Sequence, residues 1–403
     1  MSKEKENKGY PKSLVVIEVI ILAAYAVLCG YLYYMQTLKL PEYRFESDLP
    51  YHIEMALDGW GYSVTAIVYW LLSFLPGSGY LIAVFLSACT VGAICVTQKT
   101  VAKYVPNVWL CFLIALASGF VMPFFIKAVQ YSRYLGYQSG TIWHNSTYIV
   151  MKLFAAMTLM VYFSLAKRYA EKLTVKDWIV FAGLLVLTTA TKTSFVLVFA
   201  PAAFLLLALD LYLKVPLRKV LLVALTVLPT MLVIMLQRTI LFGEDTGNGI
   251  AIDFAYAVYQ TTGRPYLTMP LSLFFPLVIL AANAWGVCKD TFLDLKKRDK
   301  TLKHREYITA WLMWFFAFLE YVFLTETGNR HRDGNFLWGY SFVVFVLFVV
   351  SIVYFLNNLK NSSFAPKAVR IVYGVTAGGV LGYHIFCGIF FFVRLLSGYT
   401  YFL

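Results

Sequence analysis

The stretch LVVIEVIILAAYAVLCGYLYYM, residues 14–35, decides the class of this protein. As a helix rising about 1.5 Å per residue, it is long enough to cross the roughly 30 Å hydrocarbon core of a bilayer. It is too long for the apolar part of a signal peptide and is followed by no small-residue cleavage site. We therefore expect a retained first transmembrane helix.

Apolar runs of similar length recur along all 403 residues, which are 60% hydrophobic and 14% charged. These proportions exclude an ordinary soluble protein, and no polar stretch is long enough for a separate soluble domain. The six cysteines lie inside the apolar runs without metal-ligand spacing, which predicts small core residues and neither disulfides nor a zinc site. The prediction is an all-α, polytopic fold forming a single transmembrane domain over residues 1–403.

The net charge of +13 comes from Lys and Arg divided among short loops between the apolar runs. That distribution orients a membrane protein and argues against nucleic acid as a partner. Placing the basic loops in the cytoplasm predicts about eleven spans, with a cytoplasmic N-terminus and an external C-terminus. The predicted spans are 14–35, 80–97, 107–126, 148–166, 177–191, 195–213, 220–236, 267–288, 307–324, 336–356 and 371–392.

The first outer loop, residues 36–79, contains the stretch Phe45-Glu46-Ser47-Asp48-Leu49-Pro50-Tyr51-His52. Acidic groups so close to lipid are costly unless they face water, bind an ion or do chemistry. Asp48 either caps an interfacial helix that starts near Pro50 or serves as a general base. Further along the loop, the apolar run 61–75 is short and ends at Pro76-Gly77, which predicts a re-entrant or interfacial helix.

With this topology, the other specific polar groups also fall on the outer side. Lys192, where two apolar runs meet, either extends to the membrane interface or holds a lipid phosphate. Trp143 and Tyr148 fit an interfacial aromatic belt, whereas His144 between Trp143 and Asn145 has no role in such a belt. The remaining outer-side groups are His52, Arg238, Glu244, Asp245, Arg264, Glu326, Arg330, His331, Asp333 and Asn335.

The long first helix, the acidic pair Glu46-Ser47-Asp48, the Tyr51-His52 helix start and about eleven spans without a soluble domain resemble bacterial integral membrane glycosyltransferases of the GT-C type. The segments Trp143–Thr147 and Lys192–Phe195 are similar to outer-edge segments of such proteins. The resemblance implies inverting transfer of a sugar from a polyprenyl-phosphate-linked donor to a glycan or lipid acceptor, at the outer face of the cell (plasma) membrane.

The resemblance also implies roles for individual residues. Asp48 or Glu46 would be the general base, and the same two carboxylates would hold a divalent cation (Mg²⁺ or Mn²⁺) if one is used. Lys192, Arg264, Arg330 and His331 would hold the lipid phosphate. His52, His144, Asn145 and Asn335 complete the predicted substrate-binding set.

Two alternatives remain open at this stage. A cell-surface polysaccharide polymerase or ligase would depend more on the outer loop 237–266 and less on Asp48. A transporter or flippase of lipid-linked glycans would place charges within spans, where Glu18 and Glu320 are candidates, and would show paired half-molecules. No internal repeat is found in the sequence.

Overall fold

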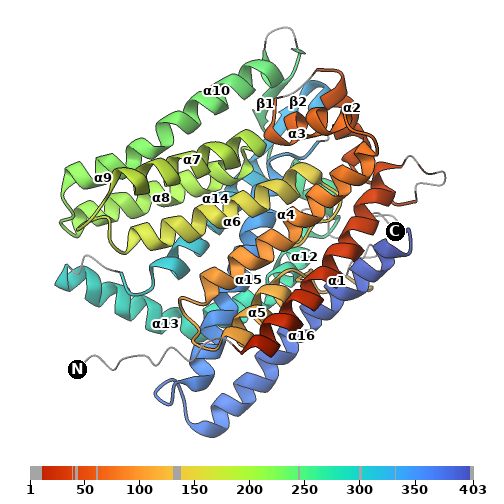
Figure 1. Ribbon diagram of the computed structural model, residues 1–403. Helices are drawn as coiled ribbons and strands as arrows, with labels where there is room; N and C mark the ends of the chain where they lie inside the picture. The colour runs from red at the N-terminus through yellow and green to blue at the C-terminus, as the bar shows by residue number, and fades with distance from the viewer. Residues whose placement is uncertain are drawn as a thin grey trace.

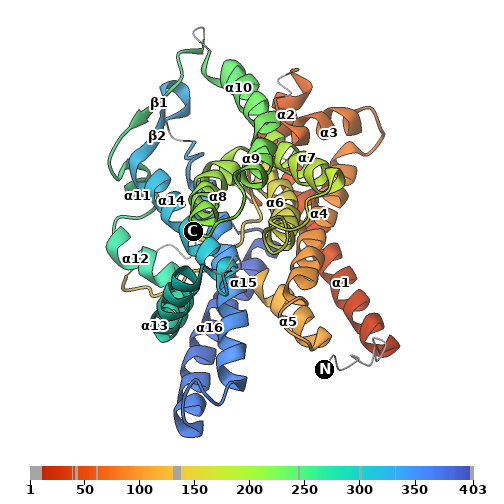
Figure 2. The same ribbon diagram turned by 90° about the vertical axis from the view of Figure 1, so that its left-hand side faces the viewer.

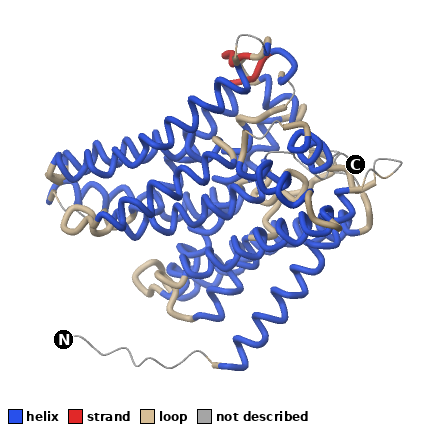
Figure 3. The backbone as a smooth tube through the Cα atoms, turned by 45° about the horizontal axis from the view of Figure 1, so that its top comes forward, coloured by secondary structure: helices blue, strands red, loops and turns tan. Residues whose placement is uncertain are grey.

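The computed structural model describes residues 11–38, 40, 44–59, 62–129, 138–243, 246–298, 302–331 and 333–399, without the side chain of Thr261. Long helices run roughly parallel from one end of the molecule to the other (Figure 1). The tube view shows that most of the described chain is helical (Figure 3). This is the architecture of a multi-pass membrane protein.

Within the described residues, seven helical segments are long and apolar enough to cross a membrane, or eight if one bent pair forms a span. The bent pair is α12 (Pro265–Ser272) and α13 (Phe274–Lys297), which meet at 71°. The seven are α1 (Lys12–Thr37), α4 (Ser78–Val101), α6 (Ser146–Ala166), α8 (Ser194–Tyr212), α9–α10 (Leu217–Ala224 and Leu228–Phe242, joined by the 3₁₀ turn Leu225–Val227), α15 (Leu337–Lys360) and α16 (Lys367–Leu396).

The predicted number of about eleven spans is therefore not confirmed. Three predicted spans correspond to helices that are shorter or more polar: α5 (Val108–Ser118), α7 (Val175–Thr191) and α14 (Arg305–Phe323). The prediction was wrong for residues 107–126, because α5 ends after 11 residues and Gly119 is followed by non-helical chain. An apolar run alone does not distinguish a helix from an extended segment buried in protein.

That non-helical chain packs against other parts of the bundle. Met122 and His384 of α16 are joined twice: Met122 N donates to the His384 carbonyl at 3.3 Å, and His384 Nδ1 lies 2.6 Å from the Met122 carbonyl. Phe124 N donates to the Leu271 carbonyl at 3.2 Å. Non-helical backbone is tolerated at membrane depth only where protein or trapped water satisfies it, and α12 and α16 do so here.

The helix α15 is the centre of the fold. Its most apolar window is 83% buried, compared with 17% for α1. It is apolar on all sides, as expected for a helix surrounded by others, and it contacts α8, α13, α14 and α16. Figure 2, viewed at 90° to Figure 1, shows α1 and α13 on opposite flanks of the molecule.

A buried ion pair joins α8 to α14. Arg305 donates from Nη1 and Nη2 to the two carboxylate oxygens of Asp210, both at 2.7 Å, and Tyr169 donates to Asp210 Oδ2 at 2.5 Å. Because both charges are removed from water, each depends on the other for its stabilisation.

The expectation of an all-α fold needs one correction. Strand β1 (Gly249–Ile252) pairs antiparallel with β2 (Leu324–Thr327), with Gly249 opposite Thr327. The pair connects the segment after α10 to the segment after α14. Beside it, the Asn248 side chain accepts from Asn329 N at 3.1 Å, which holds the turn Gly328–Arg330 in place.

The bundle has two ends. The end that carries α2 (Leu49–Leu57), α3 (Val64–Ser73), β1 and β2 is called the first-loop face (Figure 1). The opposite end, called the basic face, carries the turns 102–107, 167–174, 213–216, 302–304 and 361–366. The helix α11 (Tyr256–Thr261) follows β1.

Candidate functional site

Asp48 and Asn145 meet at the first-loop face. Asn145 is the N-cap of α6 and accepts a hydrogen bond from Tyr148 N at 2.9 Å through its side-chain oxygen. Its side-chain nitrogen donates to Asp48 Oδ2 at 2.7 Å. Asp48 stands at the N-cap position of α2 but makes no side-chain capping bond. Of the two interpretations from the sequence, capping is therefore not the role of this carboxylate.

Lys192 lies at the junction of α7 and α8 and connects two loops. Its ammonium donates to Thr147 Oγ1 and to Asn335 Oδ1, both at 3.3 Å, and lies 5.1 Å from the centre of the Trp338 ring. Thr147 in turn donates to Asn145 Oδ1 at 2.8 Å. Lys192 is thus held between the start of α6 and the segment before α15.

The segment between β2 and α15 supplies the other half of the site. Glu326 accepts from Asn335 Nδ2 at 2.8 Å and pairs with Arg330 Nε at 3.0 Å, and Arg330 also pairs with Asp333 at 3.3 Å. The result is one continuous series of hydrogen bonds and ion pairs, called here the polar chain. Its members are Asp48, Asn145, Thr147, Lys192, Asn335, Glu326, Arg330 and Asp333.

A cavity of about 340 Å³ lies beside the polar chain. Its lining combines charged side chains, among them Lys192, Arg330 and Glu326, with apolar side chains of α8 and α10, including Leu197 and Ile234. The outer surface of α10 is apolar and exposed, as at Leu232 and Leu236. The cavity therefore sets three cationic side chains, those of Lys192, Arg238 and Arg330, next to an apolar slot near the lipid-facing surface.

Burial changes the protonation of the groups around the cavity. It lowers the pKa of Lys192 to about 8, although the carboxylates of Asp48 and Glu326 partly oppose this shift. Burial also lowers the pKa of His52 and of His144 to about 4 each, so both imidazoles are neutral at pH 7. The pKa of Glu46 is raised, first by burial and then by the nearby Asp48 charge. Lys192 is thus a cation close to its titration point.

The structure places most of the predicted site residues together, with two exceptions. His52 bonds Ser146 Oγ through Nδ1 at 2.8 Å, and the His144 ring lies 5.8 Å from that of Trp338. In contrast, Arg264 is exposed and donates to the Ala128 carbonyl at 3.1 Å, and His331 stacks on Tyr256 with ring centres 4.2 Å apart. Neither belongs to the polar chain. Of the predicted site residues, Lys192, Arg330 and Asn335 line the cavity, whereas Asp48, Glu46, Asn145, His52 and His144 lie outside its lining. Glu244 and Asp245 lie outside the described residues.

Two further interpretations need correction. Trp143 and Tyr148 are fully buried and do not belong to an interfacial belt; Trp143 donates to Tyr25 OH at 3.2 Å inside the bundle. Cys288 is exposed on α13, whereas the other cysteines are buried or partly buried. Trp143 and Tyr148 flank the start of α6, and an aromatic residue at a helix end has the same sequence context whether that end lies at the membrane interface or inside the bundle.

The sequence interpretation missed several residues of the cavity. Glu320, considered only as an intramembrane charge, lines it, and its Oε2 is buried without a hydrogen-bond partner among the described residues. Gln237 donates to the carbonyls of Tyr62 and Ala190, at 3.0 and 3.3 Å, which joins α10 to α3 and α7. An uncharged polar residue in an apolar run was the only signal for Gln237.

The described part of the chain provides no metal ligand set around the first-loop carboxylates. Among the residues that the structure describes, no group of three or more His, Cys, Asp or Glu side chains is arranged to hold a metal ion. Asp48 and Glu46 thus lack a third such ligand within the described ranges.

No protein-family model matches the chain, and no curated protein sequence matches it.

Proposed function

We propose that this protein transfers a sugar from a polyprenyl-phosphate-linked donor to a hydroxyl of a glycan or lipid acceptor, at the first-loop face. The observation that carries the proposal is the cavity in which Lys192 and Arg330 stand beside an apolar slot. A lipid phosphate is complementary to such a cavity, because it has an anion at headgroup level and an apolar chain below it.

In the proposed reaction the bond between the sugar C1 and the phosphate oxygen breaks, and a bond from C1 to the acceptor oxygen forms. Lys192 and Arg330 would stabilise the negative charge that develops on the departing polyprenyl phosphate. Arg330 is kept in position by Glu326, and Lys192 by Thr147 and Asn335.

The acceptor hydroxyl must lose a proton in this displacement. Asp48 is the proposed base, with Glu46 beside it as its substitute. The Asp48 carboxylate already accepts one hydrogen bond from Asn145 and lies behind Thr147, which lines the cavity. The proposal therefore requires the acceptor hydroxyl to extend past Thr147 to Asp48, which does not itself line the cavity.

The test uses the purified full-length protein in lipid vesicles. Polyprenyl-phosphate-glucose and polyprenyl-phosphate-mannose are supplied in turn, each together with a glycolipid or an oligosaccharide as the hydroxyl acceptor, and release of polyprenyl phosphate is followed by chromatography. We expect turnover of one donor and a loss of about 10²–10⁴-fold in the Asp48→Asn variant. Asp58→Asn, an exposed carboxylate at the end of α2, is the matched control and should retain the wild-type rate.

The variants test the assignment of the base and the phosphate site separately. Wild-type rates in Asp48→Asn would show that another group is the base. Glu46→Gln, at the proposed substitute, and Glu320→Gln, at a carboxyl that lines the cavity, would then be examined. Turnover that survives Lys192→Met together with Arg330→Met would contradict the phosphate site.

A second candidate function is translocation of a lipid-linked glycan across the membrane. It is favoured by the buried charges of Glu320 and Lys152 within the bundle, since such residues often line transport paths. However, Lys152 has a structural partner, because it donates to the Gly140 carbonyl at 3.1 Å. Movement of a labelled lipid-linked glycan across vesicles without any release of polyprenyl phosphate would favour this function over sugar transfer.

A further inference from the structure

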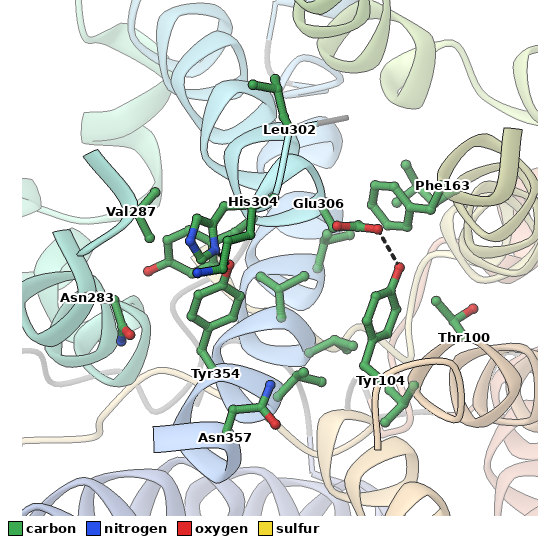
Figure 4. A pocket seen from close by; sticks show the side chains of 18 of the residues that line it. Thr100, Tyr104, Phe163, Asn283, Val287, Leu302, His304, Glu306, Tyr354 and Asn357 are labelled. Atoms are coloured by element: carbon green, nitrogen blue, oxygen red, sulfur yellow. Dashed lines mark hydrogen bonds between the residues drawn. The ribbon is translucent and has the colours of Figure 1, made fainter. Parts of the chain in front are cut away.

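A second and larger cavity, of about 780 Å³, opens at the basic face (Figure 4). Its walls come from α4, α6, α13, α14 and α15. Figure 4 shows Tyr104 and Glu306 on one side of the cavity, with His304 and Tyr354 on the other. None of the residues that line it also lines the cavity beside Lys192, so the two cavities are separate.

The cavity is long and changes character along its length. The lining positions on α15 extend from Phe342 to Asn358, which corresponds to about 24 Å along the helix axis. Its deep part is lined by apolar side chains such as Leu159, Phe345 and Val346, whereas Asn357, Asn358 and Glu306 lie toward the basic face. An apolar interior of this length with polar groups at one end matches an acyl chain and its headgroup.

The rim of the cavity carries two ion pairs, and a further lysine lies beside it. Lys167 pairs with Glu306 at 2.8 Å and Lys303 pairs with Asp290 at 2.6 Å. Lys103, next to Lys167, donates to the Met160 carbonyl at 3.2 Å and pairs with no carboxylate of the described residues. Burial and the nearby Lys167 charge both lower the pKa of Lys103. Of the side chains that line the cavity, two ammonium groups thus lie beside two carboxylates, and the third ammonium, that of Lys103, lies next to the lining.

The rim lysines can accept a further partner. The side chains of Lys167 and Lys303 are 54% and 64% exposed, and ion pairs this accessible to water contribute little. A lysine ammonium has three donors, so each can bind an incoming phosphate oxygen while it keeps its carboxylate. The network of Asp290, His304 and Tyr354, with bonds of 3.0 and 2.5 Å, holds the opposite side of the rim.

We infer that this cavity binds one anionic phospholipid from the leaflet on the basic face, with an acyl chain along α15 and the phosphate between Lys167 and Lys303. The volume is within the range of about 300–1,000 Å³ that small-molecule sites occupy. The inference is independent of the sugar-transfer proposal, because it concerns a different cavity and needs no reaction.

The test is native mass spectrometry of the purified full-length protein with added phosphatidylglycerol or phosphatidylcholine. We expect one retained phosphatidylglycerol and weaker retention of phosphatidylcholine. Replacing Lys167 or Lys303 by Gln should weaken phosphatidylglycerol binding about fivefold each, since a lysine near an anionic lipid contributes about 1 kcal/mol. Lys176→Gln, on an exposed lysine of α7 that does not line the cavity, is the control.

A second pair of variants tests whether the apolar interior of the cavity binds the acyl chain. Gly286 lines the cavity, and a Cβ added there would meet no described heavy atom within 4 Å, so Gly286→Trp should fill the cavity and abolish lipid retention. Gly183 of α7 has similar free space but lies elsewhere, so Gly183→Trp should retain the lipid.

Each remaining outcome contradicts the inference. Equal retention of the two lipids would rule out an anionic headgroup site, and unchanged retention in Gly286→Trp would place the lipid elsewhere. Displacement of phosphatidylglycerol by inorganic phosphate at the same concentration would show that the rim binds free phosphate and the apolar interior adds nothing.

Discussion

Asn145 donates its side-chain amide to Asp48 at 2.7 Å while its side-chain oxygen caps α6. One residue therefore both starts a helix and orients the proposed base. Since the first loop and α6 are far apart in sequence, this contact fixes where the carboxylate lies relative to Lys192.

Asn145→Ala should lower the free energy of unfolding by about 1 kcal/mol through loss of the cap, and should also reduce sugar transfer. Asn107→Ala removes an equivalent cap from α5, where the side chain accepts from Leu110 N at 2.9 Å, and should reduce stability alone. Thermal unfolding and donor turnover are measured for both. Equal activity in the two variants would show that Asn145 acts only as a cap.

Lys192 should make binding of a lipid phosphate sensitive to pH. Its pKa of about 8 means that the ammonium loses its proton as the pH rises from 7 to 9. Because only the charged form attracts the phosphate, polyprenyl phosphate should bind about tenfold more weakly at pH 9 than at pH 7. In Lys192→Arg the decrease should disappear, since a guanidinium stays protonated over this range. A decrease of the same size in Lys192→Arg would assign it to another group.

Arg305→Met should lower the free energy of unfolding by about 3–5 kcal/mol, because it leaves Asp210 charged, buried and without its main partner. The double variant Asp210→Leu/Arg305→Met should recover part of that loss. Arg168→Met breaks a partly exposed pair with Asp177 and should change stability by only about 0–1 kcal/mol. Thermal unfolding in detergent distinguishes these cases, and a small effect of Arg305→Met would show that water reaches the pair.

Gly388→Ala should strongly destabilise the protein, since a Cβ at this position of α16 would overlap the Phe120 carbonyl. Overpacking of this kind costs about 1–3 kcal/mol or more. Gly379→Ala in the same helix meets no described atom within 4 Å and should be neutral or stabilising. Unfolding temperatures of the two variants test this difference, and a harmless Gly388→Ala would mean that the two segments separate easily.

The sequence predicted the helical membrane fold because lipid imposes one simple requirement, long apolar runs, on every span. It also predicted that Asp48, Asn145, Lys192, Arg330 and Asn335 would share one face, since their order along the alternating spans places them there. Their contacts with one another agree with that expectation. Their chemical roles remain a proposal.

Other features could not be predicted, because they depend on pairings between distant segments. Asp210 is a single charge near the end of an apolar run and Arg305 is one of several charges in a basic loop, and only the packing of α8 on α14 joins them. The β1–β2 pair and the exposed position of Arg264 depend in the same way on how the outer segments fold back. Residues 107–126 are apolar enough for a span, but the backbone of their second half forms hydrogen bonds with α16 and α12 instead of continuing a helix.

The hydrogen bonds between the segment after α5 and the helices α12 and α16 affect how the protein is made in the membrane. The backbone of residues 120–126 finds partners in His384 and Leu271, which leave the ribosome more than a hundred residues later. Until α16 is made, this segment carries unsatisfied amide and carbonyl groups that lipid cannot solvate. The segment that follows α5 therefore cannot reach its final form during its own insertion, and α16, which is synthesised much later, completes it.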